Sequence, residues 1–225
     1  MERYARTQLL LGEEGVDRLK KSRVAVFGLG GVGSFCVEAL ARAGVGHLTL
    51  VDKDVVEESN RNRQLVALAS TLGKYKTDVM KARVLDIDET CDVSARTLFY
   101  LPETADSLPL AGYDYVADCI DNVTAKICLI LAAREQGVPV VSAMGAGNKL
   151  DPTAMKVVDL FETRVDPLAR VMRRELKKRG VDKLPVVLSE EQPVAVRADA
   201  VGSVSFVPSV MGLVMAGHII KELVK

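Results

Sequence analysis

Apolar runs alternate with segments of helical periodicity over the first two thirds of the chain. Five runs have the length and composition of β-strands: residues 24–27, 48–51, 93–100, 113–120 and 138–142. The segments with helical spacing are residues 13–20, 34–43, 76–88 and 122–136. Strands that alternate with helices at these lengths predict an α/β fold, a doubly wound, mostly parallel, Rossmann-like sheet that extends to about residue 145.

The pattern changes after residue 147. Residues 156–159 and 184–188 are predicted as short strands on either side of an amphipathic helix at 167–179. We therefore expect one domain over residues 1–225, in which an ATP-binding core at 1–147 is followed by an extension of short strands and helices at 148–225. The extension is expected to serve the substrate or a dimer contact.

Two segments near the C-terminus have distinct compositions. Residues 189–203 are polar and fit either a lid over a site or a plain surface loop. Residues 204–220 are apolar but contain Pro208 and His218, so they predict a buried helix and no membrane span. Residues 1–6 lack an apolar signal region, and we expect a cytoplasmic protein.

Composition narrows the class of protein only slightly. Hydrophobic residues make up 48% of the chain, and 30 basic side chains balance 30 acidic ones, which is typical of an ordinary soluble globular protein. A balanced net charge does not favour nucleic-acid binding, so any such contact needs a local basic patch.

The four cysteines argue against a zinc site of the usual kind. They form no C-x-x-C pair, so no zinc is expected. Cys36, Cys119 and Cys128 fall in helix or strand patterns and are expected in the core, whereas Cys91 lies in a polar turn and is expected to be a free surface thiol. No cysteine follows residue 128.

A glycine-rich turn separates the first predicted strand from the helix at 34–43. Its glycines are Gly28, Gly30, Gly31 and Gly33. They allow a tight turn and a close backbone approach to phosphate at a helix N-terminus, where free N–H groups favour anions. Asp52 ends the second strand, where dinucleotide-binding folds bind a ribose hydroxyl. These features predict a bound nucleotide but leave an NAD-binding oxidoreductase open.

Four cations follow shortly after the second strand: Arg61, Arg63, Lys74 and Lys76. Arginine binds phosphate with a planar fork and lysine supplies a compact charge, so this number of cations suits a triphosphate better than a pyrophosphate that is merely held. The segment therefore favours ATP. Lys74 fits a solvated helix face equally well.

The motifs occur in a fixed order along residues 1 to about 147: Arg3-Tyr-x-Arg6, Gly28-x-Gly-Gly-x-Gly33, Asp52, Ser59-Asn-x-x-Arg63-Gln64, Gly73-x-x-Lys76 and Asp118-x-x-Asp121-Asn122. Together they resemble the ATP-dependent activating enzymes of the ThiF, MoeB and HesA kind, relatives of the ubiquitin-activating enzymes. The resemblance implies a nucleotide site made of Gly28, Gly30, Gly31, Gly33, Asp52, Ser59, Asn60, Arg63, Gln64, Lys76 and Asn122.

The same resemblance implies roles for four residues as catalytic groups. Arg63 and Lys76 would lie at the phosphates, and Asp121 would hold magnesium. Arg6 matches an arginine that members of the family lend to the neighbouring subunit, which implies a homodimer. Attack of a carboxylate on the α-phosphate develops negative charge, and positioned cations with magnesium neutralise it.

The C-terminal third resembles one branch of that family, the tRNA threonylcarbamoyladenosine dehydratases. The matching segments are Gly145-Ala-Gly-x-x-x-Asp151-Pro-Thr153, Val158-Asp-Leu160 and Asp166-Pro-Leu-Ala169. This implies a tRNA substrate whose threonyl carboxylate is adenylated and whose own carbamoyl group closes a ring, so no catalytic thiol is needed. Some relatives have a cysteine near residues 184–189, where this chain has none.

Alternatives stay open at this point. The chain could activate the C-terminal glycine of a ubiquitin-like sulfur-carrier protein, although the missing zinc cysteines argue against it. A cysteine-desulfurase or sulfur-acceptor partner is also implied by the resemblance. The segment 170–183 carries seven cations against Glu175 and Asp182. It is either a patch for tRNA phosphates or a solvated helix face.

Overall fold

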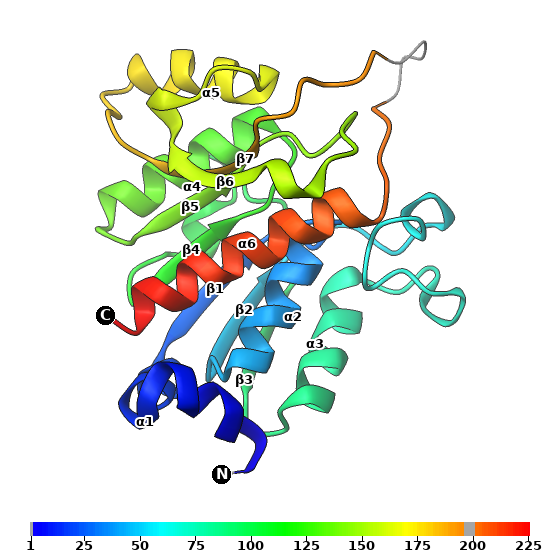
Figure 1. The fold of residues 1–225 in the computed structure, drawn as a ribbon, viewed down its shortest axis with the longest axis vertical. Helices are drawn as coiled ribbons and strands as arrows, with labels where there is room; N and C mark the ends of the chain where they lie inside the picture. The colour runs from blue at the N-terminus through cyan, green and yellow to red at the C-terminus, as the bar shows by residue number, and fades with distance from the viewer. Residues whose placement is uncertain (1, 196–200) are drawn as a thin grey trace.

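The computed structural model describes residues 2–195 and 201–225, in which seven strands form one sheet with helices on both faces (Figure 1). The strands are β1 (Arg23–Phe27), β2 (His47–Val51), β3 (Asp92–Arg96), β4 (Tyr115–Asp118), β5 (Val140–Ala143), β6 (Met155–Asp159) and β7 (Pro185–Ser189). The α-helices are α1 (Ala5–Lys21), α2 (Gly33–Ala43), α3 (Lys76–Ile87), α4 (Val123–Glu135), α5 (Pro167–Lys177) and α6 (Phe206–Leu223). The α/β prediction is confirmed.

The order of strands across the sheet is β3-β2-β1-β4-β5-β7-β6. All neighbours are parallel except β6 and β7. From β1 the chain crosses to β2 on one side, and it later returns to place β4 on the other. The carboxyl ends of β1 and β4 therefore flank the point where the winding reverses, which is where open α/β sheets bind ligands.

Alternate residues of β1 face two different cores. Val24 and Val26 pack into the core under α2, α3 and α6, whereas Ala25 and Phe27 pack into the core under α4. All four are fully buried. This explains why the strand is a continuous apolar run, because a parallel strand covered on both faces has no polar side.

The extension after residue 147 is not separate from the nucleotide-binding sheet. Strand β7 pairs in parallel with β5, and β6 pairs antiparallel with β7, so both continue the same sheet. Strand β3 ends at Arg96, four residues before the predicted end, and the chain then leaves the sheet. Helix α1 is longer than predicted and contains a break at Gly12, where φ is +74°.

Helix α6 runs across the face of the molecule over α2 and the sheet (Figure 1). By length and composition it is apolar enough to cross a membrane, contrary to the expectation from Pro208 and His218. Its packing is that of a core helix, since Met211, Met215 and Ile219 are fully buried against the rest of the domain.

Cys91 is buried, so the prediction of a free surface thiol was wrong. Its side chain is 6% exposed and its Sγ lies 3.4 Å from the carbonyl oxygen of Val45. Burial raises the pKa of the thiol to about 11. The flanking residues are polar, but the turn points Cys91 inward. Cys36 is buried as predicted, whereas Cys119 and Cys128 are half-buried.

Two glycines of α6 are expected to respond oppositely to alanine. A Cβ on Gly212 would lie 2.2 Å from the carbonyl oxygen of Val32 in the contact with α2, whereas a Cβ on Gly217 would meet nothing within 4 Å. We expect Gly212→Ala to lower the free energy of unfolding by about 1–3 kcal/mol through overpacking. Gly217→Ala should leave it unchanged or raise it by up to about 1 kcal/mol through helix propensity. Urea denaturation measures both, and equal effects would contradict the close contact between α2 and α6.

Candidate functional site

A cavity of about 580 Å³ opens at the carboxyl ends of the central strands. This volume is typical of a small-molecule site. Eight of the predicted site residues line the cavity: Gly28, Gly30, Gly31, Asp52, Arg63, Gln64, Lys76 and Asp121. The segment after β5, from Ala143 to Gly147, also lines it. The structure therefore brings together residues from four different strand ends.

The glycine-rich turn has no room for a side chain at Gly28 and little room at Gly31. Gly28 has a φ of +88°, and a Cβ there would lie 2.6 Å from the carbonyl oxygen of Cys119. A Cβ on Gly31 would lie 3.1 Å from Pro208 and 3.4 Å from Arg63, on the cavity side. Because Gly31 has no side chain, a ligand in the cavity can approach the backbone at this position.

Asp52 is fixed by two backbone amides. Its Oδ2 accepts a hydrogen bond of 2.6 Å from the N–H of Leu29 in the glycine-rich turn, and its Oδ1 accepts one of 2.8 Å from Asp54. The carboxylate is therefore held beside the turn, at the cavity wall. This is the place predicted for a group that binds a ribose hydroxyl.

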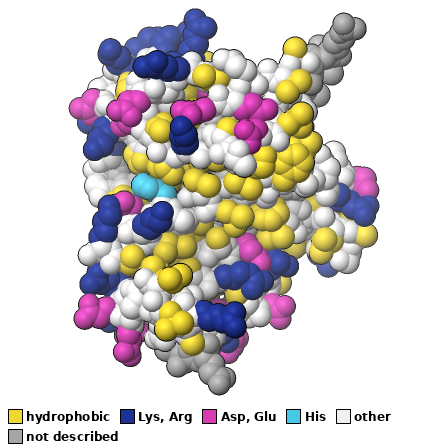
Figure 2. Space-filling model, in the orientation of Figure 1, with side chains coloured by type: hydrophobic (Ala, Val, Ile, Leu, Met, Phe, Trp, Pro, Cys, Tyr) yellow, Lys and Arg dark blue, Asp and Glu magenta, His cyan; other side chains and the backbone are white. Residues whose placement is uncertain are grey.

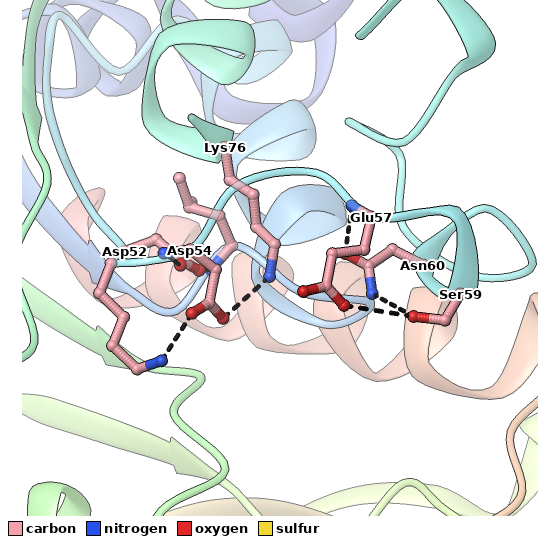
Figure 3. Close-up of polar contacts among 8 residues, drawn as sticks. Asp52, Asp54, Glu57, Ser59, Asn60 and Lys76 are labelled. Carbon is pink, nitrogen blue, oxygen red and sulfur yellow. Dashed lines mark hydrogen bonds and ion pairs between the residues drawn. The ribbon is translucent and has the colours of Figure 1, made fainter. Parts of the chain in front are cut away.

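Lys76 enters the cavity wall from the first residue of α3 (Figure 3). Its side chain is 6% exposed, and its Nζ forms an ion pair of 3.2 Å with Asp54. Burial opposes charge on Asp54, but hydrogen bonds and ion pairs with Lys53 and Lys76 outweigh it and lower the pKa of that carboxyl. Asp54 was not predicted, although it follows Asp52 by two residues at the same strand end.

Arg63 lines the cavity, and its side chain forms no ion pair with a carboxylate of the described residues. Its Nη1 donates hydrogen bonds to two neutral oxygens, the Ser59 carbonyl at 3.0 Å and Asn62 Oδ1 at 2.8 Å. The residue as a whole is half-buried, and its guanidinium contacts are exposed. An oriented cation without an anionic partner in the described residues is suited to bind phosphate.

Gln64 presents an unsatisfied acceptor at the cavity. The residue is 8% exposed, and its Oε1 is buried without a hydrogen-bond partner among the described residues. Its Nε2 lies 3.7 Å from the place of a Cβ on Gly30. A buried oxygen without a donor costs free energy, so a ligand that supplies a hydroxyl or N–H would relieve it.

Several predicted residues lie outside the cavity wall. Gly33 begins α2, and a Cβ there would lie 1.7 Å from the carbonyl oxygen of Gly28, so it serves helix–strand packing. Asn122 caps α4 by accepting a hydrogen bond of 3.0 Å from Ala125 N. Arg6 is exposed on α1, away from the cavity lining.

Ser59 and Asn60 are not in the cavity lining but belong to the turn that precedes Arg63. Asn60 Oδ1 accepts a hydrogen bond from Glu57 N, while the Ser59 hydroxyl contacts Glu57 and Asn60 (Figure 3). The Asn60 carbonyl also accepts from the N–H groups of Arg63 and Gln64, at 3.1 and 2.9 Å. The described contacts of this pair therefore hold the turn that carries Arg63 and Gln64.

An apolar wall faces the charged groups. Leu98, Phe99 and Tyr100 form part of it, just past the end of β3. These residues fall within the predicted strand 93–100, and so the wall was missed. Apolar lining residues in a cavity with a polar turn are suited to a nucleotide base.

Two fully buried ion pairs lie beneath the cavity. Lys126 Nζ lies 3.0 Å from Asp118 Oδ2, and both side chains are 0% exposed. Lys149 Nζ lies 3.0 Å from Asp166 Oδ2. The first pair supports the loop that carries Asp121, because Lys126 also donates to the Ile120 carbonyl at 3.0 Å.

The second pair supports the segment after β5. Lys149 donates to the Gly145 carbonyl at 2.9 Å, and Asp166 accepts from Gly145 N at 3.1 Å. Asp166 also caps α5 through Ala169 N at 2.9 Å. The cavity wall at Gly145 and the start of α5 are thus joined through one carboxylate.

The segment 189–203 reaches the cavity at its far end, where Val201 and Ser203 form part of the lining. Asn148 joins its two limbs. Its carbonyl accepts from Val194 N at 2.6 Å, and its Oδ1 accepts from Gly202 N at 2.7 Å. Residues 196–200 lie outside the described residues, so the alternatives of lid and surface loop are untested.

Metal-binding side chains are sparse in the part of the chain that the structure describes. It contains no group of three or more His, Cys, Asp or Glu side chains placed to hold an ion. Of the three carboxylates that line the cavity, Asp52 accepts hydrogen bonds from backbone N–H groups and Asp54 pairs with Lys53 and Lys76, whereas Asp121 has no ion pair in the described residues. A single carboxylate suits magnesium when substrate phosphates and water supply the remaining ligands.

Comparison with known proteins identifies relatives over almost the whole chain. Residues 3–225 match the model of the ThiF family. The chain is 44% identical to the tRNA threonylcarbamoyladenosine dehydratase of Bacillus subtilis (strain 168), and the alignment covers 100% of this chain and 96% of that one.

Two solved structures resemble the fold closely. The crystal structure of E. coli tRNA N6-threonylcarbamoyladenosine dehydratase in complex with AMP superimposes with a TM-score of 0.94 at 37% identity, covering 99% of this chain and 94% of that one. The structure of the same protein in complex with ATP superimposes with a TM-score of 0.93 at 36% identity, covering 99% and 93%.

Proposed function

Because this chain belongs to the ThiF family, we propose that it is an ATP-dependent tRNA threonylcarbamoyladenosine dehydratase. The observation that carries the proposal is the 44% identity to a dehydratase over the full length of both chains. The relatives solved with ATP and AMP support a nucleotide in the cavity. With tRNA as the substrate, we propose a cytoplasmic location.

The chemistry consists of two displacements. A carboxylate oxygen of the threonyl group attacks the α-phosphorus of ATP, and pyrophosphate leaves. The carbamoyl group of the same side chain then attacks the activated carbonyl carbon and loses a proton, while the carboxylate oxygen departs with AMP. The net change in the nucleoside is the loss of one water. Because the second nucleophile is part of the substrate, its effective concentration is high and no protein thiol is required.

The cavity residues fit the first displacement. Arg63 is oriented by neutral oxygens and keeps its charge for the phosphates, and Lys76 adds a second cation whose position is fixed by Asp54. Asp52 and the orphaned Gln64 oxygen accept hydrogen bonds from hydroxyl or N–H groups of the nucleotide. The residues act by orienting ATP and by stabilising charge that develops on the departing pyrophosphate.

Nucleoside mass measures the proposed activity. Incubation with ATP, magnesium and tRNA that carries threonylcarbamoyladenosine should yield a nucleoside lighter by one water, with AMP released in equal amount. Adenylation of a carrier-protein C-terminal glycine without loss of water from tRNA would overturn the proposal. The sulfur-carrier alternative lacks the full-length match, and a sulfur-acceptor partner remains a prediction from the resemblance.

Magnesium is proposed to be held by Asp121 together with the phosphates of ATP. When bound it would neutralise phosphate charge. We expect Asp121→Asn to raise the magnesium concentration for half-maximal AMP formation by about 10-fold or more, because the amide is neutral. The exposed Asp86 on α3 provides the control Asp86→Asn, which should match the wild type. An unchanged magnesium dependence of Asp121→Asn would refute the role.

A homodimer is proposed from an apolar surface on two helices. Leu9 and Leu10 on α1 are 85% and 87% exposed, about one helical turn from Arg6, and Leu213 on α6 is 46% exposed. Figure 2 shows hydrophobic side chains in a continuous band along α6. Burial of such a surface in a second copy would bring Arg6 to an interface. Sedimentation equilibrium tests this, and a monomer at micromolar concentration would contradict it.

A further inference from the structure

Helix α5 presents one apolar face and one basic face. Ala169, Met172 and Leu176 are fully buried. Arg170, Arg174 and Lys177 follow one another at spacings of four and three residues, which places them on a common face, and all three are exposed.

The charge of this region differs from that of the rest of the chain. Between residues 170 and 183 the basic side chains are Arg170, Arg173, Arg174, Lys177, Lys178, Arg179 and Lys183. The acidic ones are Glu175 and Asp182. Since the whole chain has no net charge, the remaining residues carry five more acidic than basic side chains. Figure 2 shows Lys and Arg side chains gathered at the top of the view, over α5.

Only part of this charge is neutralised within the domain. Glu175 forms ion pairs with Arg174, Lys178 and Arg179. Arg170 and Lys177 have no ion pair with any residue in the ranges 2–195 and 201–225. The face therefore keeps a net positive charge that extends along the helix.

Helix α5 begins at the cavity with its apolar side, because Arg170, Arg174 and Lys177 lie about 180–240° around the helix from Leu168. Leu168, in the first turn of α5, lines the cavity wall, and the Asp166 cap ties that turn to Gly145. From there the 11 residues of α5 extend for about 16 Å. Arg173 is not part of the free surface, because it donates to Thr163 and holds the helix in place.

We propose that Arg170, Arg174 and Lys177 form a docking surface for tRNA phosphates. The surface delivers the modified adenosine to the cavity at the start of α5. The inference rests on the proposed function, since it takes tRNA as the substrate. When the modified base of a tRNA strand enters the cavity, the phosphates on either side of that base contact the surrounding protein surface. The basic face of α5 offers them a rigid row of cations on the outer side of a helix whose first turn lies at the cavity.

Binding of unmodified tRNA transcript at several salt concentrations tests the surface. We expect the triple variant Arg170→Ala, Arg174→Ala, Lys177→Ala to bind at least about 10-fold more weakly near 0.1 M salt. The slope of log affinity against log salt should become shallower by about 2–3, because each lost phosphate contact removes about 0.7–0.9 from it. The matched control is Lys21→Ala, Lys221→Ala, Lys225→Ala, which also removes three exposed cations and should keep the wild-type slope.

Kinetics separate docking from chemistry. On tRNA carrying threonylcarbamoyladenosine, the α5 triple variant should raise KM while kcat changes little, because the cavity residues are untouched. The variant Arg170→Lys, Arg174→Lys keeps the charges and should retain the wild-type slope, which distinguishes lost charge from a disturbed fold. The two proposals can fail separately. If the wild type does not dehydrate tRNA, and the α5 triple variant loses affinity for tRNA while the control triple variant does not, the docking surface is supported and the proposed function is refuted. Wild-type affinity in the α5 triple variant, or equal losses in both triple variants, would overturn the docking surface.

Discussion

Replacing Arg63 by alanine is expected to lower the rate of AMP formation by about 10³-fold, because the variant loses a positioned cation at phosphates that develop charge. The guanidinium is held by the Ser59 carbonyl and Asn62 Oδ1 and has no carboxylate partner in the described residues. Little charge is therefore neutralised before ATP binds. Release of AMP and pyrophosphate in the presence of modified tRNA measures the effect, and circular dichroism confirms that the variant is folded.

Arg61 provides a control within the same turn. It is paired with Glu58 on the surface and does not line the cavity. Arg61→Ala removes the same charge two residues away, so it should change AMP formation by less than about threefold, consistent with a surface ion pair. If the two variants lose activity equally, the effect is general electrostatics and the specific role of Arg63 is refuted.

The sequence predicted the elements better than their connections. The apolar runs and helical spacing located the five core strands, because burial on both faces leaves a clear pattern. Strand β3 was predicted too long because apolar residues continue through Leu98 to Tyr100, and these pack beside the cavity. The pairing of β7 with β5 was missed, since a strand's composition does not identify its partner.

The predicted residues that line the cavity include those for which backbone geometry limits the choice of residue. The glycine-rich turn tolerates few alternatives, and Asp52 follows from its strand end. Ser59, Asn60 and Asn122 belong to residue types that cap helices and turns as readily as they bind phosphate, and their described contacts are of the capping kind. Whether such a residue caps a helix or turn or binds phosphate depends on tertiary contacts, and the local sequence pattern carries no information about these contacts.

Buried lysines were the residues least accessible to sequence analysis. Lys126 and Lys149 have the charge expected of a solvated surface, yet their side chains are 0% and 1% exposed. Each is enclosed with a carboxylate and with backbone carbonyls of a cavity loop. No local pattern marks them, because Lys126 pairs with Asp118 at the end of β4 and Lys149 pairs with Asp166 at the start of α5.

Replacing Lys126 by methionine is expected to lower the free energy of unfolding by about 3–5 kcal/mol, because it leaves the Asp118 carboxylate buried without its counter-ion. Among the described residues, Ser142 Oγ, at 2.6 Å, and Ile120 N, at 3.2 Å, would still donate to that carboxylate. The same change on the surface is Lys156→Met, which breaks an ion pair with Glu190 whose side chains are 55% and 54% exposed. That control should cost no more than about 1 kcal/mol. Urea denaturation measures both.

The double variant Asp118→Asn, Lys126→Met separates stability from activity. With no buried charge left unpaired, it should regain most of the lost free energy of unfolding. It should not regain full AMP formation, because the Ile120 carbonyl still lacks the Lys126 donor and the loop carrying Asp121 is no longer held. Recovery of both quantities together would mean that the buried pair serves folding alone. Recovery of stability without activity would show that the pair positions the loop at the cavity.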